Sequence, residues 1–292
     1  MIDPTPNSLN NQIVKTLEYF NVQDHPLTLL EIYKYLLNVS ADNKQATLLE
    51  IQQILPTLSE VEHAKGFYFL KGRAEIAKRR LENNYYSTFR LKRAKKYLPR
   101  VRFVPFVNAV ALTGSEAINN SKQGSDIDLL VLTAPGRIWT ARLFLTAYFQ
   151  IFGVRRHGKF VENRFCLNHY VQNGKNVGRE RHVYTAVEYV SLIPFYGADQ
   201  IYKFQQNNLE WIKNYLIQPQ LVKYPDLATS RVKVFMERLL HGKVGDYLEK
   251  LIGKMQQSRI HIQDSIVIEP DELSFHPGNK GRQILERVPF KI

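Results

Sequence analysis

Two short apolar runs that frame a glycine turn and a pair of aspartates constrain the fold of this chain more than any other feature. Residues 104–113 and 127–133 are rich in apolar and β-branched side chains, which is typical of buried strands. The first run ends at a Gly-Ser pair, and an Asp-Ile-Asp triplet begins the second. Similar runs alternate with helix-length segments up to about residue 200. This alternation predicts a mixed α/β domain with a mixed sheet.

The two aspartates of the triplet, Asp126 and Asp128, lie two residues apart on an expected strand. Both carboxylates therefore leave the same face of the strand. Two neighbouring carboxylates repel each other unless a cation lies between them. Mg²⁺, or Mn²⁺ in its place, is the natural cation because it takes oxygen ligands and also binds substrate phosphates. The pair predicts a metal site suited to in-line phosphoryl transfer.

The Gly-Ser pair is Gly114-Ser115, which we expect to end one strand and open a helix. Free backbone N–H groups and the helix dipole at such a point favour phosphate oxygens. Gly114 lets the backbone approach a phosphate without an intervening Cβ, and Ser115 can cap the helix or donate to a phosphate. Ser125, directly before the aspartates, is assigned to the same phosphate-binding group.

A Gly-Ser pair, a short helix, then Ser125-Asp126-Ile127-Asp128 and an apolar strand resembles the motif of the DNA polymerase β-like nucleotidyltransferase superfamily. The close match covers residues 107–133. The resemblance implies a metal-dependent enzyme that moves a nucleoside monophosphate from an NTP to a hydroxyl acceptor and releases pyrophosphate. The alternative is a non-catalytic regulator, antitoxin-like or transcriptional, that binds nucleotides or nucleic acid with a degenerate fold of this kind.

The resemblance also implies a third carboxylate on a later strand. In the corresponding run, residues 164–171, the expected place holds Asn168, an uncharged amide. Glu162, just before this run, and Glu188, on the next expected helix, are the two alternatives. The rest of the motif is intact, which favours an active enzyme over a protein that only binds.

Basic side chains follow the motif. Arg137 and Arg142 stand at the start of an expected buried helix, residues 138–152, and Arg155 and Arg156 come directly after it. Arginine suits bidentate contacts with phosphate, so Arg137 and Arg142 are predicted to bind the triphosphate. For Arg155 and Arg156, phosphate binding and solvation of the helix end are equally open.

Positive charge is concentrated before the motif. The chain carries a formal net charge of +13, and residues 71–102 hold twelve Lys or Arg against two acids, which gives +10. Such a block favours an anionic partner, an NTP or RNA, although a solvated basic helix face is the alternative. Interleaved aromatics either stack on bases or pack on the next domain. The predicted nucleic-acid contacts are Lys92, Arg93, Lys95 and Lys96.

Residues 1–98 are predicted to form a helical module that ends in a basic connecting helix. Three helices followed by a β-ribbon is the order of a winged helix-turn-helix, which this segment resembles. Thr28 and Glu31 have the spacing of a capping box. The expected third helix, residues 46–55, has no Lys or Arg, which favours a structural or partner-docking role over DNA reading.

The length of 292 residues suggests roughly two domains. We expect the nucleotidyltransferase core at residues 99–200 and a mostly helical region at 201–292. The single cysteine, Cys166, excludes an intramolecular disulfide and predicts a reducing, cytoplasmic environment, and its own role is expected to be buried packing. No signal peptide is expected, and the apolar run 138–152 is too short to span a membrane.

Overall fold

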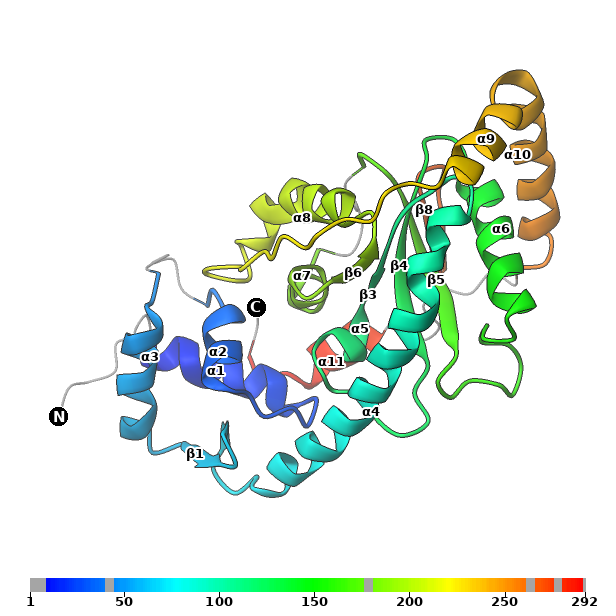
Figure 1. Cartoon of the computed structure of the whole chain (residues 1–292). Helices are drawn as coiled ribbons and strands as arrows, with labels where there is room; N and C mark the ends of the chain where they lie inside the picture. Colours follow the sequence, from blue (N-terminus) through cyan, green and yellow to red (C-terminus); the bar gives the residue numbers. More distant parts are fainter. Residues whose placement is uncertain (1–8, 40–44, 176–180, 261–265, 276–279, 291–292) are drawn as a thin grey trace.

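The middle of the chain folds around a mixed six-stranded sheet (Figure 1). Its strands, in spatial order, are β6 (Ile193–Tyr196), β3 (Val107–Leu112), β4 (Ile127–Thr133), β5 (Phe165–Gln172), β8 (Glu272–Phe275) and β7 (Ile266–Ile268). Strands β4 and β5 are parallel, and all other neighbours in the sheet are antiparallel. The computed structural model describes residues 9–39, 45–175, 181–260, 266–275 and 280–290. The mixed-sheet α/β fold predicted from the sequence is confirmed.

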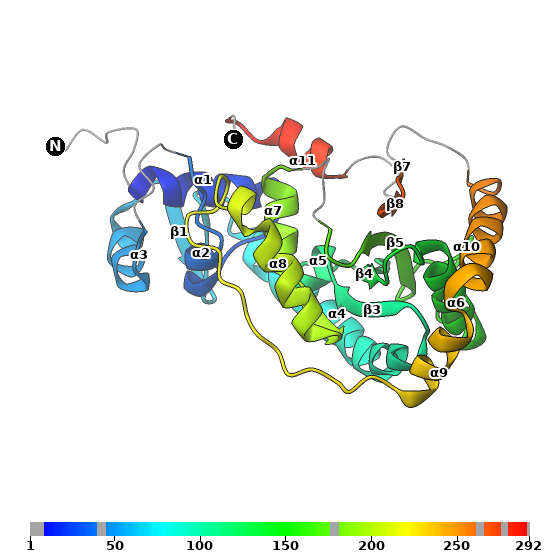
Figure 2. The same ribbon diagram turned by 90° about the horizontal axis from the view of Figure 1, so that it is seen from above.

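Helices cover both faces of this sheet (Figures 1 and 2). The helices of this part of the chain are α5 (Gly114–Ala117), α6 (Ile138–Ile151), α7 (Val183–Val190), α8 (Ala198–Ile212), α9 (Arg231–Leu239), α10 (Gly242–Gln257) and α11 (Lys280–Arg287). Helices α7 and α8 pack on one face and α6 on the other, while α10 lies against the outer side of α6. Among the described residues, no helix is both long and apolar enough to cross a membrane.

The two central strands are buried on both faces. In β3, Ala109 and Ala111 contact the core shared with α7 and α8, whereas Val110 and Leu112 contact the core shared with α6. Leu129 and Leu130 of β4 divide between the two cores in the same way. A strand covered on both faces needs apolar side chains at every position, which explains why these segments read as continuous apolar runs.

The N-terminal part of the chain has the predicted element order of three helices and a β-hairpin. Its elements are α1 (Leu9–Asn21), α2 (Leu29–Lys34), α3 (Leu48–Ile54), the 3₁₀ helix η1 (Leu55–Thr57), β1 (Val61–Ala64) and β2 (Phe67–Leu70). The predicted capping box at Thr28 and Glu31 is confirmed, since Thr28 N donates to Glu31 (2.9 Å) and Glu31 N to Thr28 Oγ1 (3.2 Å). Thr47 and Glu50 form a second capping box at α3.

The region after residue 200 is less helical than predicted, because it completes the core sheet. Strand β8 pairs with β5, with Ser274 opposite His169, and β7 pairs with β8. Strands of three or four residues are too short to give a periodic signal in the sequence. Residues 219–230 form neither helix nor strand and connect α8 to α9 (Figure 2).

The long helix α4 (Glu75–Tyr97) joins the N-terminal part to the core and continues into the 3₁₀ helix η2 (Leu98–Phe103). The middle of its buried face is polar, not apolar, and contacts the loop at residues 118–122. Asn83 donates to the Asn120 side chain (2.7 Å), and Ser87 Oγ accepts from Ser121 N (3.2 Å). Each of these contacts satisfies a polar group that the buried loop would otherwise leave without a partner.

Arg80 is the point at which α4, the N-terminal helices and this loop meet. Its side chain is 3% exposed, and its guanidinium lies 2.6 Å from His25 Nδ1, 2.5 Å from Glu31 Oε1 and 3.1 Å from Ile118 O. Burial and the Arg80 charge hold the pKa of His25 well below its usual range, so the neutral ring accepts from the arginine.

Replacing Arg80 by methionine removes the donor that contacts the buried His25, the buried Ile118 carbonyl and the partly buried Glu31, and it keeps most of the side-chain volume. We expect the free energy of unfolding to fall by about 2–4 kcal/mol, because the Glu31 charge and the Ile118 carbonyl lose their partner. Urea unfolding followed by circular dichroism measures this. Arg79→Met is the matched control: Arg79 pairs with Asp24 on the surface, so its loss changes stability by less than about 1 kcal/mol. Equal losses in both variants would contradict a special role for Arg80.

Candidate active site

The Gly-Ser turn rests directly on one of the two aspartates. Thr113 N, just after β3, donates to the backbone carbonyl of Asp128 (3.2 Å), which brings the end of β3 beside the start of β4. A Cβ placed on Gly114 would lie 3.2 Å from Asp128 Oδ2, and the φ of Gly114 is +65°. Glycine is therefore required here for its backbone conformation and for the space it leaves.

The short helix expected after Gly114 is present as a single turn of four residues. Thr113, not Ser115, is the residue before this turn, and its side chain makes no capping hydrogen bond. Turn-forming residues follow at once, with Asn119 and Gly124 at positive φ. A dipole effect from so short a helix is small, so the turn offers mainly the N–H groups of its first residues.

Both aspartates have a neighbour from the β5 side of the sheet. Asp126 Oδ2 accepts a hydrogen bond from Arg156 Nη1 (2.6 Å), and Asp128 Oδ1 accepts from Asn168 Nδ2 (2.9 Å). The parallel pairing of β4 and β5 sets Cys166 opposite Asp128. The ligand atoms of Asp126, Asp128 and Cys166 all lie within 4.8 Å of one another, which makes the three a possible metal-holding group.

Asn168 and Cys166 are therefore the residues of β5 that lie beside the aspartates, where the resemblance implies a third acid. Burial, reinforced by the two aspartates, raises the pKa of the Cys166 thiol, so the sulfur is protonated. A neutral thiol is a poor ligand for Mg²⁺, which prefers oxygen. The sequence interpretation treated Cys166 as packing only. Its spacing of two residues from Asn168, on the same face of a strand, was the signal that could have placed it here.

Arg156 is fixed in place by its own backbone. Arg156 N donates to Phe165 O (3.0 Å), and Phe165 N donates to Val154 O (2.9 Å), so the loop after α6 runs beside the start of β5. The Arg156 guanidinium also lies 3.3 Å from Cys166 Sγ. The sequence left Arg156 between phosphate binding and solvation of the helix end; the structure shows it paired with Asp126.

Glu116 is a third carboxylate near Asp128 that sequence reasoning did not single out. It is buried, and its Oε1 accepts from Ser121 Oγ (2.8 Å). Burial and the neighbouring Asp128 carboxylate raise the pKa of Glu116 to about 7. The fully buried Arg90, which donates to Lys122 O (2.8 Å), attracts both Glu116 and Asp126 electrostatically. Glu116 directly follows the Gly-Ser pair in the sequence, and this position was the signal that could have identified it.

A cavity of about 360 Å³ opens beside the Gly-Ser turn. Its lining includes Gly114, Ser115, Lys122, Ser125 and Glu188. Helix α11 closes another side with Gln283 and Arg287. Of the two alternatives for a third acid, Glu188 lines this cavity, whereas Glu162 is exposed and does not line it.

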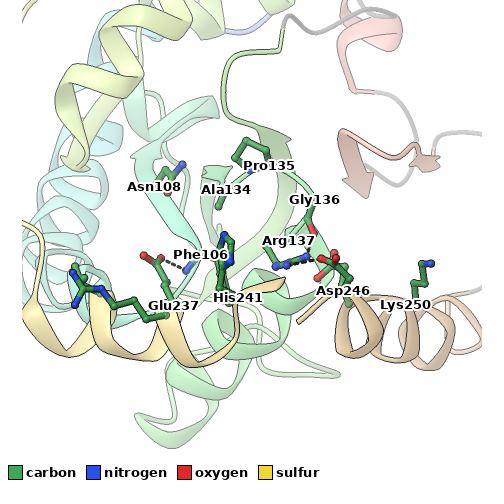
Figure 3. Close-up of a pocket in the computed structure, with 13 residues that line it drawn as sticks. Phe106, Asn108, Ala134, Pro135, Gly136, Arg137, Glu237, His241, Asp246 and Lys250 are labelled. Carbon is green, nitrogen blue, oxygen red and sulfur yellow. Dashed lines mark hydrogen bonds and ion pairs between the residues drawn. The ribbon is translucent and has the colours of Figure 1, made fainter. Parts of the chain in front are cut away.

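The two arginines predicted to bind the triphosphate lie elsewhere. Arg137 follows the far end of β4, about 20 Å from the aspartates at a strand rise of ~3.3 Å per residue, and pairs with Asp246 (2.6 Å; Figure 3). Arg142 donates to Gln256 and lies 4.8 Å from the ring centre of Phe275. The structure does not bring them to the aspartates, because α6 starts at the opposite end of β4.

The predicted nucleic-acid contacts lie on the outer side of α4. Lys92, Lys95 and Lys96 are exposed, while Arg93 is half-buried and packs on Tyr97, 5.5 Å from its ring centre. Of the interleaved aromatics, Tyr85 is 71% and Phe89 48% exposed, so these two are free to stack on a partner. Tyr97 instead contacts Phe152 and Phe165 in the core.

Comparison of the chain with protein-family models, with curated proteins and with solved structures finds no match. The resemblance to the nucleotidyltransferases therefore depends on the motif residues and on the arrangement described above.

The pairing of Arg156 with Asp126 predicts weaker metal binding than two free carboxylates would give. Arg156→Gln should lower the Kd for Mn²⁺ about fivefold, because a partly exposed ion pair of this kind contributes on the order of 1 kcal/mol. Electron paramagnetic resonance of free Mn²⁺ measures the change. Arg155→Gln is the control, since it removes the same charge from the same loop without touching Asp126. Equal tightening in both variants would point to general electrostatics instead.

Proposed function

We propose that this chain is a metal-dependent nucleotidyltransferase that moves a nucleoside monophosphate from an NTP to a hydroxyl acceptor. The observation that carries the proposal is the contact between the Gly-Ser turn and Asp128, where a Cβ on Gly114 would lie 3.2 Å from the carboxylate. A phosphate on the turn and a cation on the aspartates would then occupy one site. Ser115 and Ser125, which line the adjoining cavity, are suited to donate to the phosphates.

The side chains at the aspartate pair fit one divalent cation. Mg²⁺ commonly binds through one or two carboxylates together with substrate phosphates and water, and Asp126 and Asp128 supply two. When bound, Mg²⁺ or Mn²⁺ neutralises charge on the phosphates and on the leaving pyrophosphate. Arg156, whose side chain is 38% exposed, has room to leave Asp126 and contact a phosphate instead.

Glu188 is the residue we assign to deprotonate the acceptor hydroxyl. It lines the same cavity as Ser115 but comes from α7, which forms another wall of the cavity. Burial, followed by the neighbouring Glu188 carboxylate, raises the pKa of Tyr184, which sets both side chains in one corner of the cavity. A carboxylate on this wall would face an acceptor that enters beside the Gly-Ser turn.

RNA is the acceptor that the charge distribution favours. The exposed side of α4 carries Lys92 and Lys96 together with Tyr85 and Phe89, a combination of charge and aromatic surface that suits a single strand. The opposite side of the same helix holds the loop at 118–122, which leads from the Gly-Ser turn to the aspartates. An RNA strand on the exposed side would be separated from this loop by the width of the helix, about 10 Å.

A non-catalytic nucleotide-binding regulator is the second candidate, and one observation favours it. Asn168 and Cys166 line the β5 side of the aspartates, and Arg156 already neutralises Asp126. A site with this balance of charge could hold a nucleotide through its phosphates without turning it over. The enzyme and the regulator differ in whether label from an NTP becomes covalently attached.

Incorporation of labelled nucleotide separates these two functions. With Mg²⁺, total RNA and each NTP in turn, we expect label in RNA from one or more NTPs. The double variant Asp126→Asn, Asp128→Asn should lose at least about 100-fold of the rate. Glu188→Gln should lower kcat by about 100-fold or more while NTP binding stays unchanged, as for a lost general base.

Glu162→Gln is the matched control for Glu188, because Glu162 is exposed and lies outside the cavity. It should retain the wild-type rate. No incorporation by the wild type with any NTP, together with preserved NTP binding, would leave the regulator as the function. Wild-type rates in the double aspartate variant would exclude this site as the catalytic centre.

Reversal of charge on α4 tests the RNA assignment separately. The variant changes Lys92, Arg93, Lys95 and Lys96 to Glu. We expect RNA binding to weaken at least tenfold and the slope of log Kd against log salt to become shallower, because fewer counterions are released. Filter binding at several salt concentrations measures both. The control reverses four basic residues beyond α7: Lys203, Lys213, Lys223 and Arg231. A similar loss in the control would show non-specific attraction only.

A further inference from the structure

A second cavity, of about 830 Å³, lies at the opposite end of β3 and β4 from the aspartates (Figure 3). One wall is the end of the sheet, with Phe106 and Asn108 at the start of β3 and Ala134 just after β4. The other wall is the α9–α10 hairpin. A cavity of this size matches a small-molecule site, and nothing in the proposed nucleotidyl transfer uses it.

Acidic side chains that line the cavity hold the hairpin on the core. Glu237 accepts from Phe106 N (2.6 Å), and Asp246 pairs with Arg137 (2.6 Å). Glu249 accepts from the first backbone N–H groups of α6, at Trp139 (2.8 Å) and Thr140 (2.9 Å). All three negative charges that line the cavity are therefore committed to the fold.

Arg137 pairs with Asp246, but the other two cations that line the cavity are not committed in this way. Among the described residues, neither Arg238 on α9 nor Lys250 on α10 has an ion-pair or hydrogen-bond partner for its side chain. Figure 3 shows His241 between the two helices and Lys250 standing out from α10. Arg137 neutralises Asp246, and the buried Lys233 lies 3.7 Å from Glu237, so Arg238 and Lys250 face only the charge of Glu249 and leave a positive balance for an incoming molecule.

The rest of the lining is apolar with one polar group. Ala134, Pro135 and Val234 line the cavity, and the side-chain amide of Asn108 has no partner among the described residues. Phe106 has a φ of +62°, which is uncommon for a bulky residue and directs its N–H to Glu237. Such strained backbone persists only where surrounding contacts hold it, and it is frequent at ligand sites.

We propose that this cavity binds a small organic anion. Its phosphate or carboxylate group would pair with Arg238 on α9 or with Lys250 on α10, and its apolar body would lie on Val234 and Pro135. Asn108 would add one hydrogen bond that selects among ligands. The site is independent of the proposed active site, because the aspartates lie about 20 Å away along β4.

The test uses the full chain and the fluorescent probe 8-anilinonaphthalene-1-sulfonate, an apolar aromatic body with one sulfonate. Arg238→Ala with Lys250→Ala should raise the Kd of the probe at least tenfold. Val234→Trp, which fills the cavity without a change of charge, should do the same. Arg231→Ala with Lys243→Ala is the matched control, since it removes the same charges from the same two helices outside the cavity. This control should stay within twofold of wild type.

Competition then identifies the anion. Adenosine monophosphate tests a phosphate ester, and 1-naphthoate tests a carboxylate on an apolar body; displacement of the probe by either supports the proposal and tells the two apart. The proposal fails if neither competes, if Val234→Trp and the cavity double variant bind the probe as wild type does, or if the control loses as much affinity. Circular dichroism and thermal unfolding of each variant show that the fold is retained, so a loss of binding reports on the cavity.

Discussion

The polar stripe on the buried side of α4 is the constraint on which the proposed active site depends. The loop at residues 118–122 joins the Gly-Ser turn to the aspartate strand, yet it belongs to no helix or strand, so its backbone needs partners from elsewhere. Arg80, Ser87 and Arg90 supply them, through Ile118 O, Ser121 N and Lys122 O. This stripe therefore adds to the hydrogen bond from Thr113 N to Asp128 O in holding the turn beside Asp128.

Charge within the site is balanced mainly by the protein itself. Asp126, Asp128 and Glu116 lie close together, and Arg156 and the buried Arg90 offset them. Such a balance allows the site to fold without a metal, since paired or hydrogen-bonded carboxylates lose less on burial than isolated ones. It also means that a cation must compete with an arginine. This competition is the physical feature that connects the two candidate functions.

The two ends of the β3–β4 pair differ because of what their acids do. At one end, the aspartates remain partly accessible, and the Gly-Ser turn that touches Asp128 lines a cavity. At the other, Glu237 and Glu249 bind backbone N–H groups and so attach the α9–α10 hairpin to the sheet. Polar attachment leaves a gap where apolar packing would close one. The proposed metal and phosphate site and the proposed anion site thus lie at the two ends of one pair of strands.

Local patterns in the sequence determined the strands β3 and β4, the capping box at Thr28, and the shared face of Asp126 and Asp128, because turn chemistry and side-chain alternation act over a few residues. The tertiary structure decided which distant groups meet them. Parallel pairing of β4 with β5 places Cys166 beside the aspartates. Helix α6 begins at the far end of β4, so Arg137, which precedes it, lies away from the aspartates. Strand order and helix direction fix these contacts, and both result from packing of the whole chain, which no short segment encodes.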